Sequence, residues 1–117
     1  MSIPTDYQAF IHQSRYSRWL PEERRRETWE ETVSRLLSFY RNFLEKRHNY
    51  KLPHRLFTDL YTSIVTMGVM PSMRAMMTAG TALERNHIAA YNCAYLPVDS
   101  PRSFDECLFI LLHGTGV

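Results

Sequence analysis

Residues 91–117 constrain the fold most, because they place a cysteine on a predicted strand, followed by a helix and a glycine turn. Residues 88–96 are almost continuously apolar or aromatic, which is typical of a strand buried on both faces. Ser100 and Pro101 predict the start of a helix and Gly114 its end. A glycine turn normally leads into another element. We therefore expect this chain to be the front end of a larger catalytic fold that already carries one reactive thiol.

The predicted strand over residues 88–96 has no second strand candidate to pair with in the sequence. A buried strand needs partners for its backbone N–H and C=O groups. We expect those partners to come from outside this chain, which favours a larger fold independently of any family.

The sequence before residue 87 predicts a mainly helical region. Thr28 and Glu31 form a capping-box pattern, after which apolar residues recur at helical spacing as far as Leu44. A second helix is expected from Pro53 to Gly68. Residues 70–72 are expected to be extended, because Pro71 disfavours helix at Met70. A short helical turn is expected over residues 73–78, ended by Gly80. Three further indications are weaker: a short first helix around residues 7–11, a helix over the charged run 22–26, and Pro21 at that helix's first position.

The composition favours a globular protein without a strong electrostatic partner. Hydrophobic residues make up 44% and charged residues 22% of the 117 residues, and the net charge is +2. This charge implies neither nucleic-acid nor membrane binding. The arginine run 24–26 is flanked by glutamates, so a solvated helix face is expected there. No apolar run approaches the roughly 20 residues of a membrane span, and the N-terminus has no signal pattern, so we expect a cytoplasmic protein.

The sequence contains two cysteines, Cys93 and Cys107, which are expected to be thiols and not a structural disulfide. Their spacing fits no zinc pattern, so no metal site is expected. Cys93 allows two interpretations: a small buried hydrophobic residue, or a redox thiol at the end of a barrel strand. Cys107 falls on an apolar helix stripe and is expected to be core.

Two short segments could contact an anionic ligand. In Pro71-Ser72-Met73-Arg74, a hydroxyl, a helix start and a guanidinium together suit an anion, and the alternative is an ordinary N-cap beside a solvated Arg74. The turn 114–116 has two glycines that would let backbone approach a nucleotide, although this signal alone is weak.

Several segments, taken together and in order, resemble the adenosylcobalamin-dependent (class II) ribonucleotide reductases of the monomeric ribonucleoside-triphosphate reductase type. Two of them are Met70-Pro71-Ser72-Met73-Arg74 and Asn92-Cys93-Ala94. The matching stretches are residues 14–19, 26–33, 70–80, 91–98, 104–106 and 114–117.

This resemblance implies a helical region over residues 1–86, followed over residues 87–117 by the first strand, helix and glycine turn of a ten-stranded α/β barrel. It implies a reaction in which the ribose 2′-hydroxyl is replaced by hydrogen. A thiyl radical, generated with adenosylcobalamin, abstracts the 3′-hydrogen, and two further cysteines supply reducing equivalents and become a disulfide. Thioredoxin or a similar dithiol then reduces that disulfide.

The resemblance also implies roles for individual residues. Cys93 matches one of the two reducing cysteines. Pro71 and Ser72 match the segment along the substrate phosphates and ribose. Asn92 lies on the strand that lines the substrate pocket, and the turn of Gly114, Thr115 and Gly116 matches the one that closes over the nucleotide. The radical cysteine, the second reducing cysteine and most of the cobalamin site are expected in a remaining barrel portion, without which this chain is expected to be inactive.

Two alternatives belong to other functional classes. The chain could be a standalone helical interaction module in which Cys93 only packs and an exposed strand edge binds a partner. Nucleic-acid binding through the arginine run is less favoured, because neighbouring acidic residues cancel its charge.

Overall fold

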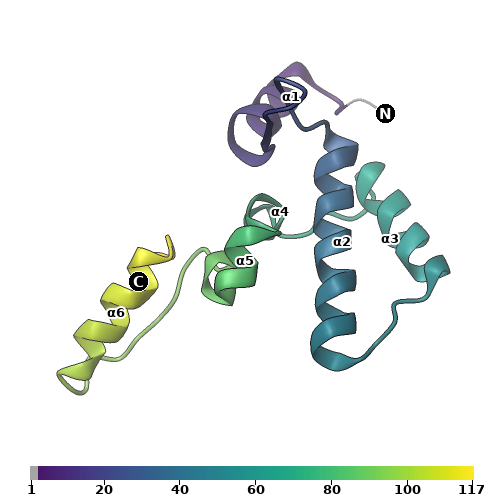
Figure 1. Ribbon diagram of the computed structural model, residues 1–117. Helices are drawn as coiled ribbons and strands as arrows, with labels where there is room; N and C mark the ends of the chain where they lie inside the picture. The colour runs from purple at the N-terminus through teal and green to yellow at the C-terminus, as the bar shows by residue number, and fades with distance from the viewer. Residues whose placement is uncertain (1–2) are drawn as a thin grey trace.

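The computed structural model describes residues 3–117, and helices form most of its regular structure (Figure 1). The prediction of a mainly helical chain is confirmed, and the described part contains no helix that is long and apolar enough to cross a membrane. In chain order the elements are α1 (Asp6–Ile11), the π-helical turn η1 (His12–Tyr16), β1 (Trp19–Leu20), β2 (Arg25–Arg26), α2 (Trp29–His48), α3 (His54–Val65), α4 (Met73–Thr78), α5 (Thr81–Arg85), the 3₁₀ turn η2 (His87–Ala90) and α6 (Arg102–Leu112).

Helix α2 is the central element, and its start follows the predicted capping box. The Thr28 side chain accepts from the backbone N–H of Glu31 at 3.3 Å, and the Glu31 carboxylate accepts from the backbone N–H of Thr28 at 2.7 Å. One face of the helix is apolar at helical spacing and is buried, as predicted. The buried hydrophobic residues of α2 are Trp29, Val33, Leu36 and Leu37.

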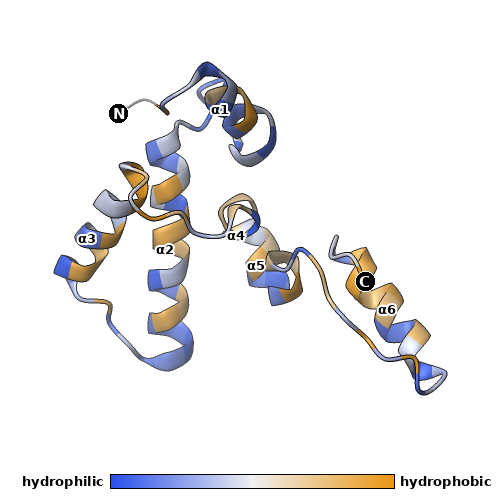
Figure 2. Ribbon diagram, turned by 180° about the vertical axis from the view of Figure 1, so that it is seen from behind, coloured by the Kyte–Doolittle hydropathy of each residue, from blue (hydrophilic) through white to orange (hydrophobic). Residues whose placement is uncertain are grey.

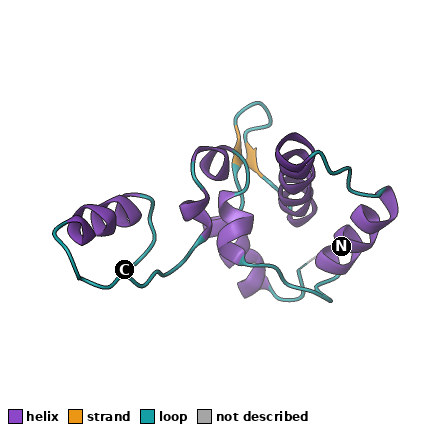
Figure 3. Cartoon of the chain, turned by 90° about the horizontal axis from the view of Figure 1, so that it is seen from below, coloured by secondary structure: helices purple, strands orange, loops and turns teal. Residues whose placement is uncertain are grey.

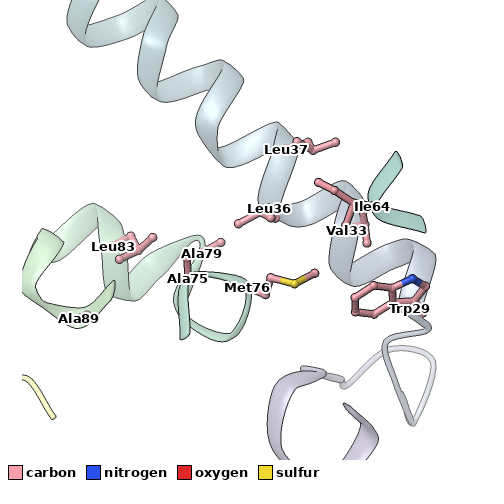
Figure 4. Packing of buried hydrophobic residues seen from close by; sticks show 10 residues of the cluster. All are labelled: Trp29, Val33, Leu36, Leu37, Ile64, Ala75, Met76, Ala79, Leu83 and Ala89. Carbon is pink, nitrogen blue, oxygen red and sulfur yellow. The ribbon is translucent and has the colours of Figure 1, made fainter. Parts of the chain in front are cut away.

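The core lies between α2 and the helices on its two sides (Figure 4). Ile64 of α3 lies beside Val33, and Met76 of α4 approaches α2 from the other side. Val33 and Met76 are fully buried, and each such side chain contributes roughly 1.5–3 kcal/mol to folding. The indole N–H of Trp29 donates to the Val65 carbonyl at 3.1 Å, which fixes the end of α3 against the start of α2.

The helix predicted from Pro53 to Gly68 forms, but it ends earlier than expected. Pro53 is its N-cap, and regular structure ends at Val65. The left-handed residue after the helix is Met67, with φ of 59°, and not Gly68. The Val69 N–H closes the end by donating to the Ser63 carbonyl at 3.1 Å.

The prediction of a helix over residues 22–26 is wrong, because this segment belongs to a small antiparallel hairpin (Figure 3). Trp19 pairs with Arg26 across it. The charged run has no apolar face to bury as a helix, and the hairpin lets Arg25 make a bidentate contact with Glu31, both bonds 2.7 Å long. The Arg25 guanidinium lowers the pKa of Glu31 to about 2.

A buried ion pair joins the hairpin, α2 and α4. The Glu27 carboxylate accepts from Arg35 Nε at 2.8 Å and Nη2 at 2.9 Å, and from the backbone N–H of Arg18 at 3.2 Å. Arg35 Nη1 also donates to the carbonyls of Met76 and Ala79, at 2.8 and 2.9 Å. Arg18 Nη2 donates to the same Ala79 carbonyl at 2.7 Å. Two guanidinium groups therefore hold the C-terminal end of α4.

His12 is a second buried polar residue next to this ion pair. Its Nε2 lies 2.9 Å from the Thr32 hydroxyl, whose single proton is directed toward Glu27 or the Thr28 carbonyl, so Nε2 is the donor to Thr32. The ring packs edge-on against Trp29 at 5.4 Å. Burial lowers the pKa of His12, an effect that nearby Glu27 opposes only in part.

The strand predicted over residues 88–96 is wrong for most of its length. Residues 87–90 form η2, and only Cys93 makes a bridge, which is parallel and pairs with Gly116. A strand persists only where neighbouring backbone takes up its polar groups, and the described chain offers one short segment for this. The expectation that the chain holds no partner for the segment is also wrong, since Gly116 is that partner.

The predicted C-terminal helix forms as α6, but its apolar stripe is not buried in a hydrophobic core. Cys107, expected to be buried, is only half-buried. Figure 2 shows α6 as a largely hydrophobic helix standing apart from the helices around α2. Its most exposed apolar residues are Leu112 at 76%, Phe104 at 67% and Leu108 at 57%.

We predict that Arg35→Met lowers the free energy of unfolding by about 3–5 kcal/mol, because it leaves the Glu27 carboxylate buried without its cation. Urea unfolding followed by circular dichroism measures the change. Arg102→Met is the matched control: its pair with Glu106 is exposed, so a loss of at most about 1 kcal/mol is expected. Equal losses in the two variants would contradict this account of the ion pair.

We predict that the chain loses stability as pH falls below about 6.5, the ordinary pKa of histidine. The folded state lowers the pKa of His12, so the unfolded chain binds a proton there more readily and protonation favours unfolding. Unfolding free energies measured between pH 7.5 and 5 should therefore show a smaller slope in His12→Gln. An unchanged slope would rule out His12 as the source.

Candidate functional site

Cys93 lies where two distant segments of the chain meet. The backbone N–H of Ala94 donates to the Gly116 carbonyl at 2.7 Å, and the backbone N–H of Gly116 donates to the Asn92 carbonyl at 3.1 Å. These bonds flank Cys93 and form the parallel bridge. Asn92, Cys93 and Gly116, all candidate site residues, are therefore brought together by backbone pairing.

The buried side chain of Thr115 binds the glycine turn to the segment before Cys93. Only 1% of the residue is exposed, and its hydroxyl lies 2.8 Å from the Ile88 carbonyl and 2.9 Å from the Tyr91 carbonyl. The hydroxyl is therefore used within the protein, and the exposed parts of the turn are Gly114 and Gly116.

Arg74 connects α4 to the glycine turn. Its Nη2 donates to the Gly114 carbonyl at 2.6 Å, and its Nε donates to the Ala89 carbonyl at 3.1 Å. The sequence allowed either an anion contact or a solvated side chain at this position. The structure shows a third arrangement, in which the guanidinium binds backbone carbonyls of two other segments.

Pro71 and Ser72 lie immediately before α4, the helix that contains Arg74. The Ser72 hydroxyl caps the helix by accepting from the Ala75 N–H at 3.4 Å, as the ordinary N-cap interpretation predicts. Ser72 is exposed and Pro71 is half-buried. The link between this segment and the Cys93 region runs through Arg74.

The Cys93 residue is exposed, and both cysteines of the chain are free thiols. The interpretation of Cys93 as a packing residue is therefore wrong. Tyr91 and Tyr95, which flank it, are 62% and 89% exposed. An exposed thiol next to open backbone can take part in thiol–disulfide exchange once a second sulfur is brought to bonding distance.

The comparisons with known proteins identify the family. The family model for the ribonucleotide reductase alpha domain matches residues 3–81. Adenosylcobalamin-dependent ribonucleoside-triphosphate reductases from Lactobacillus leichmannii and Lactobacillus delbrueckii subsp. bulgaricus are each 30% identical over 97 residues. The enzyme of that name from Levilactobacillus brevis is 30% identical over 99 residues. This chain belongs to the ribonucleotide reductase alpha domain family.

The fold is similar to part of a solved structure from the same group. A crystal structure of a B12-dependent (class II) ribonucleotide reductase matches 72% of this chain with a TM-score of 0.56 and 26% identity. Both kinds of match cover 13% of the known protein, and the curated matches cover 78% of this chain. The chain thus spans about one eighth of the length of these relatives.

Two features of the site were missed by sequence reasoning. The Arg74 guanidinium and the Thr115 hydroxyl both bind main-chain carbonyls far away in the sequence. Every residue has a carbonyl, so no sequence pattern marks which of them a side chain will reach. The double glycine around Thr115 was the available signal, because it indicated a backbone that must be approached closely.

We predict that Gly114→Ala opens the turn. Gly114 has φ of +81°, and a Cβ there would lie 2.7 Å from Arg74 Nη2. The strain of about 1–3 kcal/mol should raise the rate of chymotrypsin cleavage at residues 91–95 roughly tenfold. Gly116→Ala is the control, because its Cβ would lie 3.7 Å from the Asn92 carbonyl oxygen, an ordinary contact. Equal cleavage of the two variants would contradict the prediction.

Proposed function

We propose that this chain forms the N-terminal part of an adenosylcobalamin-dependent ribonucleoside-triphosphate reductase, with a helical region over residues 1–86 and the start of a ten-stranded barrel over residues 87–117. The observation that carries the proposal is the exposed Cys93 thiol held against the glycine turn by pairing with Gly116. The family match and the names of the relatives support the same reaction class.

Cys93 acts in this proposal as one of two reducing thiols. Cys93 and a second cysteine outside this chain each give up one electron and one proton, and a sulfur–sulfur bond forms between them. The ribose 2′-hydroxyl leaves as water and a hydrogen takes its place, so two electrons and two protons balance the reaction. Thioredoxin or a similar dithiol regenerates the two thiols by exchange.

The substrate, a ribonucleoside triphosphate, is proposed to lie between two groups of residues. Pro71 and Ser72 approach its phosphates and ribose from the start of α4. Asn92 and the turn of Gly114, Thr115 and Gly116 lie along its other side, with Thr115 contributing backbone only because its hydroxyl is already bonded. Exposed glycine backbone suits this role, since a ligand can approach the chain closely where no side chain stands in front of it.

Adenosylcobalamin supplies the radical chemistry in this enzyme class, and most of its site is proposed to lie in the remaining barrel portion. The radical step is likewise assigned to the remaining barrel portion. We place the enzyme in the cytoplasm.

The exposed apolar stripe of α6 supports a remaining barrel portion as the partner of this chain. Phe104, Leu108 and Leu112 would be buried once further strands and helices cover the stripe. The alternative of a standalone interaction module also explains this stripe, but it gives no role to the exposed thiol.

We predict that a chimera, in which this chain replaces the matching segment of the Lactobacillus leichmannii reductase, reduces ribonucleoside triphosphates in the presence of adenosylcobalamin. Cys93→Ser should abolish multiple turnover with thioredoxin, because serine cannot form the disulfide. Deoxyribonucleotide formation measured by chromatography follows the reaction. Cys107→Ser is the matched control and should retain activity, since Cys107 is only half-buried and lies on α6.

Full turnover by the Cys93→Ser chimera would refute the redox assignment. The interaction-module alternative would instead be favoured if the isolated chain bound a partner equally well with Cys93 or Ser at this position and no active chimera formed.

A further inference from the structure

Two segments meet at the candidate thiol: the one that leads into Cys93 and the glycine turn. Among the hydrogen bonds of residues 3–117, Arg74 is the one side chain from outside these segments that binds both. It reaches Ala89 in η2, just before the Cys93 segment, and Gly114 in the turn that pairs with it. A guanidinium can serve two acceptors in different directions through its rigid fork of N–H donors, whereas a lysine presents a single point charge.

The Arg74 guanidinium lies directly against the glycine turn. Arg74 Nη2 occupies the space that a Cβ at position 114 would need, with a separation of only 2.7 Å. Gly114 also has φ of +81°, a conformation that L-residues with side chains rarely adopt. The Arg74 guanidinium therefore fills the space beside Gly114, which a side chain at position 114 would take.

Only one residue, Thr115, lies between the Arg74 contact at Gly114 and the backbone bonds of Gly116 beside Cys93. Gly114 is followed by Thr115, whose hydroxyl fastens the turn to the Ile88 and Tyr91 carbonyls. The next residue, Gly116, makes the two backbone bonds that flank Cys93. Figure 3 shows the C-terminal end returning to the connection that follows η2, where these contacts occur.

We propose that Arg74 is a positioning residue, which sets the register of Cys93 against Gly116 and fixes this pair relative to the Pro71–Ser72 segment at the start of α4. The inference rests on the proposed function in one respect, namely that Cys93 is the working thiol. Arg74 itself forms no bond to substrate in this proposal, because it acts through the two carbonyls that it holds.

Amide hydrogen exchange on the ¹⁵N-labelled full chain tests the positioning contact directly. In Arg74→Met, the amides of Ala94 and Gly116 should exchange at least about tenfold faster, the scale expected for losing hydrogen bonds from a charged donor. The amide of Leu36, in the middle of α2, should keep its rate. Arg55→Met is the control, since the Arg55 side chain is 95% exposed and should change neither amide.

Arg74→Lys gives a second, milder test that keeps the charge. It should produce intermediate exchange at Ala94 and Gly116, because the ammonium keeps the charge but lacks the rigid fork of N–H donors that serves both carbonyls. Unchanged exchange at these amides in both variants would overturn the proposal. An equal acceleration at Leu36 would also overturn it, because that result assigns Arg74 to general stability and not to local register.

Kinetics of the chimera show whether the register matters for the reaction. Arg74→Met should lower kcat at least about tenfold with KM for the nucleotide little changed, and Arg74→Lys should recover part of kcat. A rise in KM alone would contradict a positioning role and favour direct substrate binding. Failure of the redox assignment appears separately, as an active Cys93→Ser chimera, and leaves the exchange result intact.

Discussion

The buried ion pair between Glu27 and Arg35 is the interaction on which the other contacts depend. It joins the residue after the hairpin to the second turn of α2, and the same arginine reaches the last turn of α4. Burial alone would raise the pKa of Glu27, but hydrogen bonds from Arg35 and the Arg18 backbone outweigh this and lower it. The carboxylate therefore stays charged, and one polar centre joins the hairpin, α2 and α4 beside their apolar core.

Helix α4 connects this ion pair to the candidate site. Arg18 and Arg35 fix its C-terminal end through the Ala79 carbonyl, while Arg74, near its start, reaches the glycine turn. Only the six residues of α4 separate the two arginine contacts. The position of the Cys93 thiol thus depends on electrostatic contacts to main-chain carbonyls more than on apolar packing, and apolar packing around α6 is incomplete in this chain.

The sequence predicted the helical elements where local signals are strong and failed where long-range contacts decide. The capping box at Thr28 and the limits of α4 agree with the structure, because both follow from residues three or four positions apart. The run 22–26 belongs to a hairpin instead of a helix, because Arg25 makes a bidentate ion pair with Glu31. The strand predicted around Cys93 shrank to one bridge, because apolar character indicates a strand without supplying the neighbours that it needs.

The sequence by itself determined the chemistry on offer, namely two thiols, a serine-capped helix start and a glycine turn, and its motifs indicated the reductase family. Only the tertiary structure decided that Cys93 is exposed, that Gly116 pairs with it, and that Arg74 spans the two segments. The physical reason is that local patterns record interactions along one helix or turn. The acceptors that fix this site are main-chain carbonyls, which are the same at every residue and become distinct only when folding brings one of them within reach of a donor.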